Sequence, residues 1–486
     1  MKNIIMIFAV LSCMVFTSGC DFLDVNPRTE VPADKIFTTE DGFEDALNGC
    51  YMKMNNNSLY GRFLTLSGID FLAGYYEPSS VGSMEVGLFE MNYENDYVKT
   101  QIKSTYTDFY NVILQINDIL ENLETEQALS AIRRQEKRNL LKGEALALRA
   151  FLHFDILRLF GPVPKSADKK VRLPYSEVTG VEARPLYGYE EFVGKIKKDI
   201  EEAELLLADD PCITHNLNTH VHEDVKDNFY HYRKFRFNYY ALKALKARLY
   251  LYIGDTAGAY TEAMGIIQAK NTDGSRYFKL AGDNDFNMSY FALPSETIMG
   301  LTNSGLENNE CERLFKNDQS AFPMLFTELR REKMFNQYNA GSNNRYNRWW
   351  GEVTNPTGGT NPYYKKYMQN EGSSSDSDKL ANKWLGPLFR LSEIYLIAIE
   401  STTDLAEANR LYSEYMLARN VQVDNYFTSL GKEIQDACIF DARIEFMAEG
   451  QLFYAYKRTR TKTRYFDSKL VKDELYVVPV PESELK

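Results

Sequence analysis

Apolar residues recur at spacings of three and four along most of this chain, a pattern that predicts amphipathic helices. The clearest stripe covers residues 140–160, where leucines and alanines repeat until Gly161 and Pro162 end it, because proline cannot continue a helix. A polar cap at residues 38–41 predicts a shorter helix over residues 43–51. Further stripes predict helices over residues 97–123, 187–207, 240–253, 257–267, 389–400, 405–419 and 432–458.

Some of these helices form repeated pairs. Residues 240–267 and residues 389–419 each contain a helix, a short polar turn and a second helix. Each pair spans about 30 residues, close to the ~34-residue period of tetratricopeptide units. One pair cannot bury its apolar face alone, so several must stack into a solenoid-like block. The sequence therefore predicts a mostly α fold, with helical pairs over about 97–267 and 387–458.

Two segments, about 60–95 and 270–386, have a different composition. They are rich in glycine, serine, asparagine and tyrosine, and residues 355–362 and 372–375 carry strong loop signals. Irregular stretches of this length are usually functional or disordered. Their aromatic residues argue against disorder. We expect a loop-rich irregular half that packs on the helical block.

The first residues have the pattern of an export signal. Lys2 supplies a positive charge, residues 4–11 form an apolar run, and Ser18 and Gly19 precede Cys20. This run is too short to cross a bilayer core of about 30 Å as a helix. The pattern predicts a lipoprotein signal peptide over residues 1–19, with acyl chains on Cys20.

Two alternatives to this lipidation site stay open. Residues 10–13 form a competing signal that ends at Cys13, and an ordinary secreted protein would leave Cys20 unmodified. We favour Cys20 because cleavage at Cys13 would leave a very short apolar core. More than one acyl chain gives stable membrane attachment. The polar, proline-containing residues 20–36 are then an extended, lipid-anchored tether.

Charge and cysteine usage exclude several classes of protein. The formal net charge of −12 repels phosphate backbones, so we expect no nucleic-acid partner. No C-x-x-C spacing is present, so neither a zinc site nor a thioredoxin-like motif is predicted. Disulfides cannot be assigned from the sequence, and we expect buried thiols for at least two of the four later cysteines: Cys50, Cys212, Cys311 and Cys438.

Aromatic residues make up 13% of the chain. Their rings suit the apolar faces of sugars, although most of them fill contacts between helices. Three loop segments combine them with polar residues, and in each the alternative is a ring that anchors the loop. Adjacent side chains on an extended strand face opposite ways, so at most one of two neighbouring tryptophans should reach a ligand. The candidate ligand contacts are Trp349, Trp350, Tyr346, Asp70, Tyr75, Tyr76 and Tyr363.

Metal and catalytic chemistry have little support in the sequence. Four histidines lie near Glu223 and Asp224, but no three- or four-ligand zinc geometry is predicted and a solvated polar loop is favoured. These histidines are His215, His220, His222 and His231. No G-x-S-x-G, H-E-x-x-H or phosphate-binding loop is present. We expect no cofactor, no metal and no enzymatic activity, and we expect interhelical ion pairs from Glu393, Arg443, Glu445 and Glu449.

Five short motifs occur in the order in which they occur in a known family. They are Cys-Asp-Phe-Leu-Asp at 20–24, residues 145–164 with their Phe-Gly-Pro-Val-Pro end, residues 390–396, residues 443–458, and Val-Pro-Val-Pro at 478–481. Together they span nearly the full chain, which resembles the SusD/RagB family. Residues 452–456 are less polar than the common family pattern, so the resemblance is to a divergent member.

The resemblance implies a fold and a role. The fold is a single composite domain over residues 37–486, with about four tetratricopeptide-like helical pairs supporting the loop-rich half. The role is that of a lipid-anchored binding protein on the outer membrane, facing the cell exterior. Such a protein captures oligosaccharides and delivers them to a SusC-like TonB-dependent transporter. The alternatives are peptide capture on the same scaffold and a helical-toroid glycoside hydrolase.

Overall fold

A computed structural model describes residues 35–78, 83–164, 166, 169–180, 182–215, 217, 227–286, 292–303, 311–315, 326–338, 341–354, 359–368 and 385–484. Helices dominate these ranges, and the strands form three two-stranded antiparallel sheets. Within the described ranges, every helix is too short or too polar to cross a bilayer. The predicted signal peptide, Cys13, Cys20 and nearly all of the tether lie outside them.

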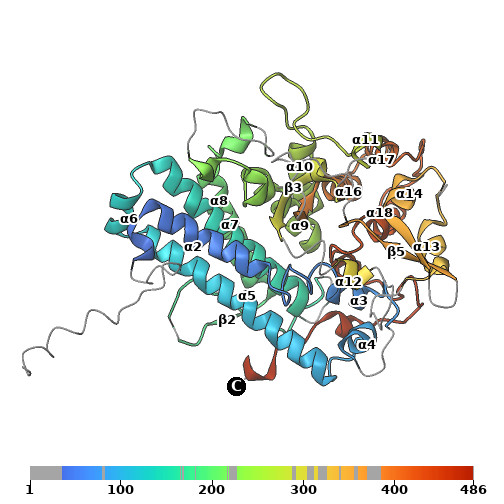
Figure 1. Cartoon of the computed structure of the whole chain (residues 1–486), viewed down its shortest axis with the longest axis horizontal. Coiled ribbons are helices and arrows are strands. Elements are labelled where there is room, and N and C mark those ends of the chain that lie inside the picture. The colour runs from blue at the N-terminus through green and yellow to red at the C-terminus, as the bar shows by residue number, and fades with distance from the viewer. Residues whose placement is uncertain are drawn as a thin grey trace, which may run out of the picture.

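Long helices build one half of the molecule (Figure 1). Most of the predicted stripes form helices within a few residues of their predicted bounds. These helices are α2 (Glu40–Met54), α5 (Asp96–Leu123), α7 (Gln135–Phe160), α8 (Tyr189–Leu206), α9 (Tyr239–Ile253), α10 (Thr256–Ile267), α16 (Leu391–Ser401), α17 (Leu405–Ala418), α18 (Lys432–Glu445) and α19 (Leu452–Thr459). They confirm the mostly α fold built from helical pairs. A short helix that was not predicted, α6 (Glu126–Ala131), lies between α5 and α7 in the chain.

The pair α9–α10 illustrates how the sequence sets the helix ends. The Asn238 side chain accepts a hydrogen bond from Ala241 N and begins α9. Gly254 ends that helix with a φ of 93°, a left-handed conformation that costs glycine little. The next residue, Asp255, then accepts from Gly258 N and begins α10. A cap, a stop and a second cap within this short stretch fold the chain back on itself, as the sequence predicts.

The single helix predicted over residues 432–458 is wrong, because the structure has two. Between α18 and α19, Ala448 and Gly450 adopt φ values of 63° and 65°. A Cβ atom on Gly450 would lie 1.8 Å from the carbonyl oxygen of Leu64. The helix breaks where an N-terminal turn packs directly against its backbone. This contact joins residues far apart in the sequence, so the periodicity could not indicate it.

The other half contains short elements, as its composition predicts. Residues 60–95 are less irregular than expected, since they include two helices. Residues 385–390 form a strand that pairs with β3, so α16 begins later than predicted. The remaining elements are α3 (Gly68–Ala73), α4 (Met84–Phe89), β1 (Leu173–Pro174), β2 (Leu186–Tyr187), α11 (Asp283–Phe286), β3 (Thr297–Thr302), α12 (Glu312–Phe315), α13 (Glu328–Phe335), α14 (Asn344–Arg348), β4 (Trp350–Thr354), β5 (Thr360–Tyr364) and β6 (Leu385–Arg390).

A buried ion network joins the two halves. Glu445 on α18 accepts hydrogen bonds from Arg390 at 2.8 Å, Arg419 at 3.0 Å and Arg345 at 3.3 Å. Because buried charges are costly unless they are paired, a closed network of this kind fixes how the halves meet. Its members are Glu296, Arg345, Lys366, Arg390, Arg419, Asp441, Glu445 and Glu449, all at most 7% exposed.

The predicted interhelical ion pairs are confirmed for Glu393 and Glu445, whereas Glu449 lies between α18 and α19 and pairs with Lys366 and Arg390 outside the helices. Glu393 pairs with Arg248, and Glu445 and Glu449 belong to the buried ion network. Arg443 differs, because its guanidinium lies 3.7 Å from the ring centroid of Tyr465. The four cysteines of the described residues are all buried thiols, as expected for at least two of them.

Candidate ligand-binding site

The structure brings two of the segments that carry predicted ligand contacts together inside the loop-rich half. Tyr75 and Tyr76, from the N-terminal segment, contact a set of rings that includes Trp350. Seven residues form a closed circle of ring contacts with centroids 4.7–6.2 Å apart, and we call them the aromatic cluster. They are Tyr75, Tyr76, Phe315, Tyr364, Trp350, Phe326 and Phe466.

Most of the predicted ligand contacts are buried. Trp349, Asp70, Tyr75 and Tyr76 have no exposed surface, and Trp350 is 5% exposed. The expectation that the two tryptophans face opposite ways, so that at most one reaches a ligand, rested on an extended backbone. Trp349 instead caps α14 with a φ of −89° and a ψ of 0°, so both rings turn inward. A ligand could reach these five side chains only after the segments that cover them had moved.

Asp70 shows what one of these side chains does. Its Oδ2 accepts hydrogen bonds from Ala448 N at 2.6 Å and from the Tyr76 hydroxyl at 3.3 Å. Burial raises the pKa of this carboxyl well above its usual value. The Ala448 amide belongs to the break between α18 and α19. Asp70 therefore holds the N-terminal segment against that break.

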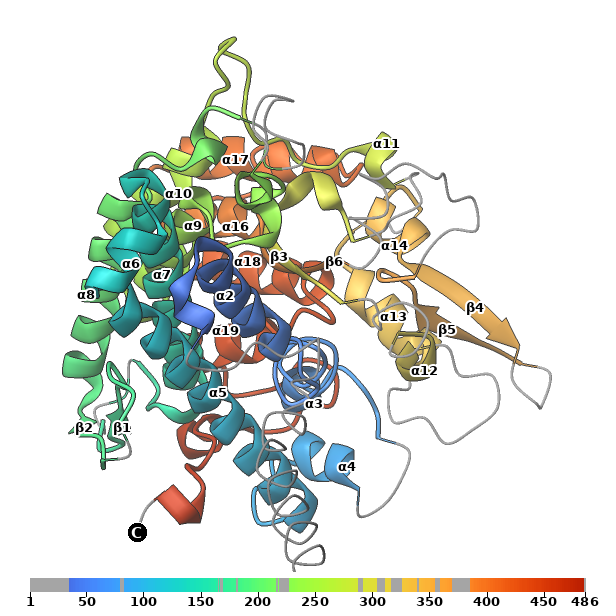
Figure 2. The same ribbon diagram turned by 60° about the vertical axis from the view of Figure 1, so that its left-hand side comes forward.

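Tyr363 is placed differently from the buried residues. On the β4–β5 hairpin it pairs across the strands with Gly351, and its side chain is half-buried. A Cβ atom on Gly351 would lie 2.4 Å from the ring carbon Cζ of Tyr363. The ring therefore lies against bare glycine backbone. The paired strands β4 and β5, at the edge of the molecule in Figure 2, thus present a partly open aromatic surface.

Tyr346, on α14, is also half-buried, but neighbouring side chains cover its ring. The Arg331 guanidinium lies 4.9 Å from its centroid, and the Phe335 ring packs edge-on at 5.1 Å. Arg331 also lies 3.7 Å from Glu352 of the hairpin. Sequence reasoning missed Gly351, Arg331 and Glu352. Gly351 could have been found from the sequence, because it is a glycine among larger residues in a predicted strand segment.

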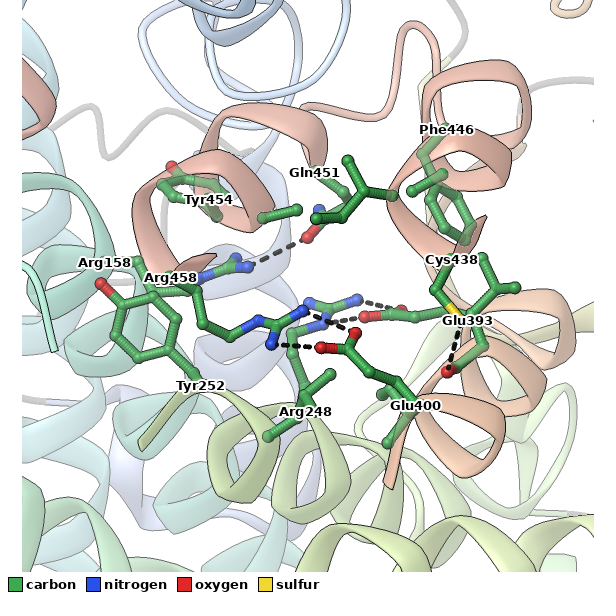
Figure 3. Close-up of a pocket in the computed structure, with 16 residues that line it drawn as sticks. Arg158, Arg248, Tyr252, Glu393, Glu400, Cys438, Phe446, Gln451, Tyr454 and Arg458 are labelled. Atoms are coloured by element: carbon green, nitrogen blue, oxygen red, sulfur yellow. Dashed lines mark hydrogen bonds and ion pairs between the residues drawn. The ribbon is translucent and has the colours of Figure 1, made fainter. Parts of the chain in front are cut away.

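A pocket of about 80 Å³ lies between α7, α9, α16, α18 and α19 (Figure 3). Two bidentate ion pairs cross it, Arg248–Glu393 at 2.6 Å and Arg458–Glu400 at 2.7 Å. Each guanidinium binds both oxygens of the carboxylate that it faces. Neither carboxylate is therefore available as a general acid or base. The pairs instead tie neighbouring helices together.

Possible metal ligands were also located. Carboxylate oxygens of Glu40, Glu44 and Asp227 lie within 4.8 Å of one another. The Lys137 ammonium bonds all three, at 2.8 Å for Glu40 and 2.6 Å for Asp227, and so already supplies the cation. His220, His222, Glu223 and Asp224 lie outside the described residues. His231 is buried and His215 bonds its own turn, so neither indicates a metal site.

Comparison with known proteins gives matches of three kinds. A family model described as "Starch-binding associating with outer membrane" matches residues 21–251. SusD-like proteins P25 and P2 of Formosa agariphila are each 29% identical over 173 and 168 residues. Each of these two alignments covers 34% of this chain and 31% of the relative. The matched segments thus span about a third of these relatives.

Solved structures match over nearly the whole chain. A SusD superfamily protein from Bacteroides thetaiotaomicron has a TM-score of 0.68 at 20% identity, covering 92% of this chain and 97% of its own. A laminarin-binding SusD-like protein has a TM-score of 0.62 at 15% identity, covering 92% and 98%. At such low identity these structures establish the fold. The family model and these two curated relatives, which each match less than half of the chain, support its resemblance to the SusD/RagB family.

Proposed function

We propose that this protein is a lipid-anchored, non-enzymatic surface protein that captures oligosaccharides and delivers them to a SusC-like TonB-dependent transporter. The description of the matching family model names starch binding and the outer membrane. One structural relative is titled as laminarin-binding. We place Cys20 as the acylated residue, residues 20–36 as the tether and residues 37–486 as one composite domain.

The position of the Tyr363 ring is the observation that carries the proposal. Its ring rests on Gly351 and keeps part of its surface open on a paired hairpin. Stacking of a sugar's C–H face on such a ring contributes about 0.5–1.5 kcal/mol beyond the area buried. A ring already held in place loses little freedom when the ligand binds. Tyr363 is thus the first of the seven predicted residues to test.

Capture without cleavage is supported by the state of the carboxylates. Glycoside hydrolysis needs two carboxyl groups about 5–10 Å apart that flank the scissile bond. The carboxylates singled out in the sequence, Glu393, Glu445 and Glu449, are each paired with arginine. Each of them is occupied by its arginine partner, whereas a catalytic carboxyl group must be free to reach the scissile bond.

Calorimetric titration of the purified protein with neutral β-1,3-glucan oligosaccharides tests the proposal. We expect binding that falls about tenfold in Tyr363→Ala, since a stacking ring of this kind is worth ~1 kcal/mol or slightly more. Tyr97→Ala removes a tyrosine that is 66% exposed on α5 and serves as the matched control. Release of new reducing ends would favour the hydrolase. Binding of peptides without any glycan would favour peptide capture.

A further inference from the structure

A second concave site lies far along the chain from Tyr363, at one end of the helical half. It is a groove of about 580 Å³, within the usual ligand-site range of about 300–1,000 Å³. The groove is lined by the middle of α5, by the β1–β2 pair with its connection and by the C-terminal segment, and Figure 2 shows β1, β2 and the C-terminus on the same side of the molecule. These three elements supply the walls, which include Tyr110, Asn111, Arg172, Arg184 and Glu484.

Two arginines of the groove are held by backbone carbonyls. Arg172 donates from Nε and Nη2 to the Leu186 carbonyl at 3.1 and 2.8 Å. Arg184 donates from Nη2 to the carbonyls of Val178 and Gly180 at 2.7 and 2.6 Å. Carbonyls fix a guanidinium without neutralising it. The site is therefore preorganised, with positive charge and N–H donors in place.

Other arginines of this chain differ from these two in their partners, which are carboxylates. Arg248 and Arg458 each face a carboxylate in a bidentate pair at 2.6–2.7 Å. Arg172 lies 3.6 Å from a carboxylate oxygen of Glu191, whose side chain is 65% exposed. A planar guanidinium binds carboxylate or sulfate through two parallel hydrogen bonds. An anionic group of a ligand could therefore bind an arginine of the groove, whereas the arginines of the helical pocket are already paired with carboxylates.

The remaining wall residues suit a polyhydroxylated molecule. The Tyr110 hydroxyl donates to the Pro174 carbonyl at 2.8 Å, which fixes its ring in the wall. Asn111, Ser176, Glu182 and Glu484 also line the groove and can accept or donate hydrogen bonds to hydroxyl groups. Leu114 and Leu186, at 43% and 50% exposed, add apolar surface at the rim.

We propose that this groove is a second oligosaccharide-binding site, selective for sugars that carry a carboxylate or sulfate group. Arg172 and Arg184 bind the anionic group, and the tyrosine, amide and carboxylate side chains bind the rest of the sugar. The inference extends the proposed capture function to a second site. It uses other residues, so the two proposals can fail separately.

Titration of the full protein with three probes tests the inference: trigalacturonate, a sulfated carrageenan tetrasaccharide and neutral laminaritetraose. We expect at least one anionic probe to bind, and Arg172→Gln to weaken it about tenfold, as loss of a charged hydrogen bond does. The response of each anionic probe assigns carboxylate or sulfate. Arg410→Gln removes an exposed arginine of α17 that pairs with Glu407 and is the matched control.

The same variants separate the two proposals. Arg172→Gln should leave laminaritetraose binding unchanged, and Tyr363→Ala should leave anionic binding unchanged. The affinity of Arg184→Gln for the anionic probes is interpreted only if the variant unfolds at the same temperature as wild type. This control is needed because Arg184 also donates hydrogen bonds to the carbonyls of its own loop. Failure of both anionic probes to bind, or an unchanged affinity in Arg172→Gln, would overturn the groove assignment. Failure of the neutral probe alone would overturn the hairpin site.

Discussion

The backbone amide of Ala448 donates a 2.6 Å hydrogen bond to Oδ2 of Asp70, across 378 positions of sequence. Ala448 lies where α18 ends and α19 has not begun, with a φ of 63°. Asp70 lies on α3, in the N-terminal part of the loop-rich half. A residue predicted to hold a ligand is thus part of the packing that sets the shape of the C-terminal helices.

Loss of this acceptor should destabilise the protein. Asp70→Ala leaves the buried Ala448 amide without its bond, which costs about 1–3 kcal/mol. Asp70→Asn keeps an oxygen acceptor and should cost less. Chemical denaturation of both variants measures the difference. Equal stability of Asp70→Ala and wild type would contradict the assigned role.

Removing the central carboxylate of the buried ion network should have a larger effect. Glu445→Gln leaves the network with one buried positive charge more than it has carboxylates, and we expect a loss of about 3–5 kcal/mol in the free energy of unfolding. Glu407→Gln, which removes the partner of the exposed Arg410, should cost about 1 kcal/mol or less. Urea unfolding of the two variants compares them directly. Similar losses in both would mean that the network contributes little.

Lys366 predicts a pH dependence. Burial and the Arg390 guanidinium lower its pKa from 10.5 to about 8. Between these values the unfolded chain binds more protons than the folded one, so this residue's contribution to stability rises with pH. The difference in unfolding free energy between wild type and Lys366→Met should increase from pH 8 to pH 10.5, by about 2 kcal/mol. Lys432→Met removes an exposed lysine and is the matched control.

Gly351 offers a test of the hairpin surface that leaves Tyr363 in place. In Gly351→Ala the new Cβ would displace the Tyr363 ring from the glycine backbone against which it lies. We expect neutral glycan affinity to fall with little change in thermal unfolding, because the outer end of the ring can move away. Gly265→Ala is the control, since its Cβ would meet nothing within 4 Å. Unchanged affinity in Gly351→Ala would separate the ring position from binding.

The lipid anchor is tested by fractionation. Cys20→Ser should release the protein from the membrane fraction, because no acylated residue would remain. Cys13→Ser should leave it membrane-bound with an unchanged lipid mass by mass spectrometry. The reverse result would move the acylated residue to Cys13. Release in neither variant would exclude both cysteines as the anchor.

The sequence by itself determined the helical half. Apolar spacing and local caps act within one helix or one turn, so residues such as Asn238, Gly254 and Asp255 set the ends of α9 and α10 without help from distant contacts. The composition of residues 270–386 likewise predicted the loop-rich half. The motif order predicted the family, because short motifs are local too.

Only the tertiary structure decided what the singled-out residues do. Periodicity carries no information about which segments meet, so it could not indicate that Leu64 breaks the last helix at Gly450. Nor could it indicate that Tyr75, Tyr76 and Trp350 are buried in one aromatic cluster. Aromatic residues in a loop have the same sequence pattern whether they face a ligand or a core. Their exposure depends on packing between segments hundreds of residues apart, and that packing left Tyr363 as the ring with an open surface on the paired strands β4 and β5.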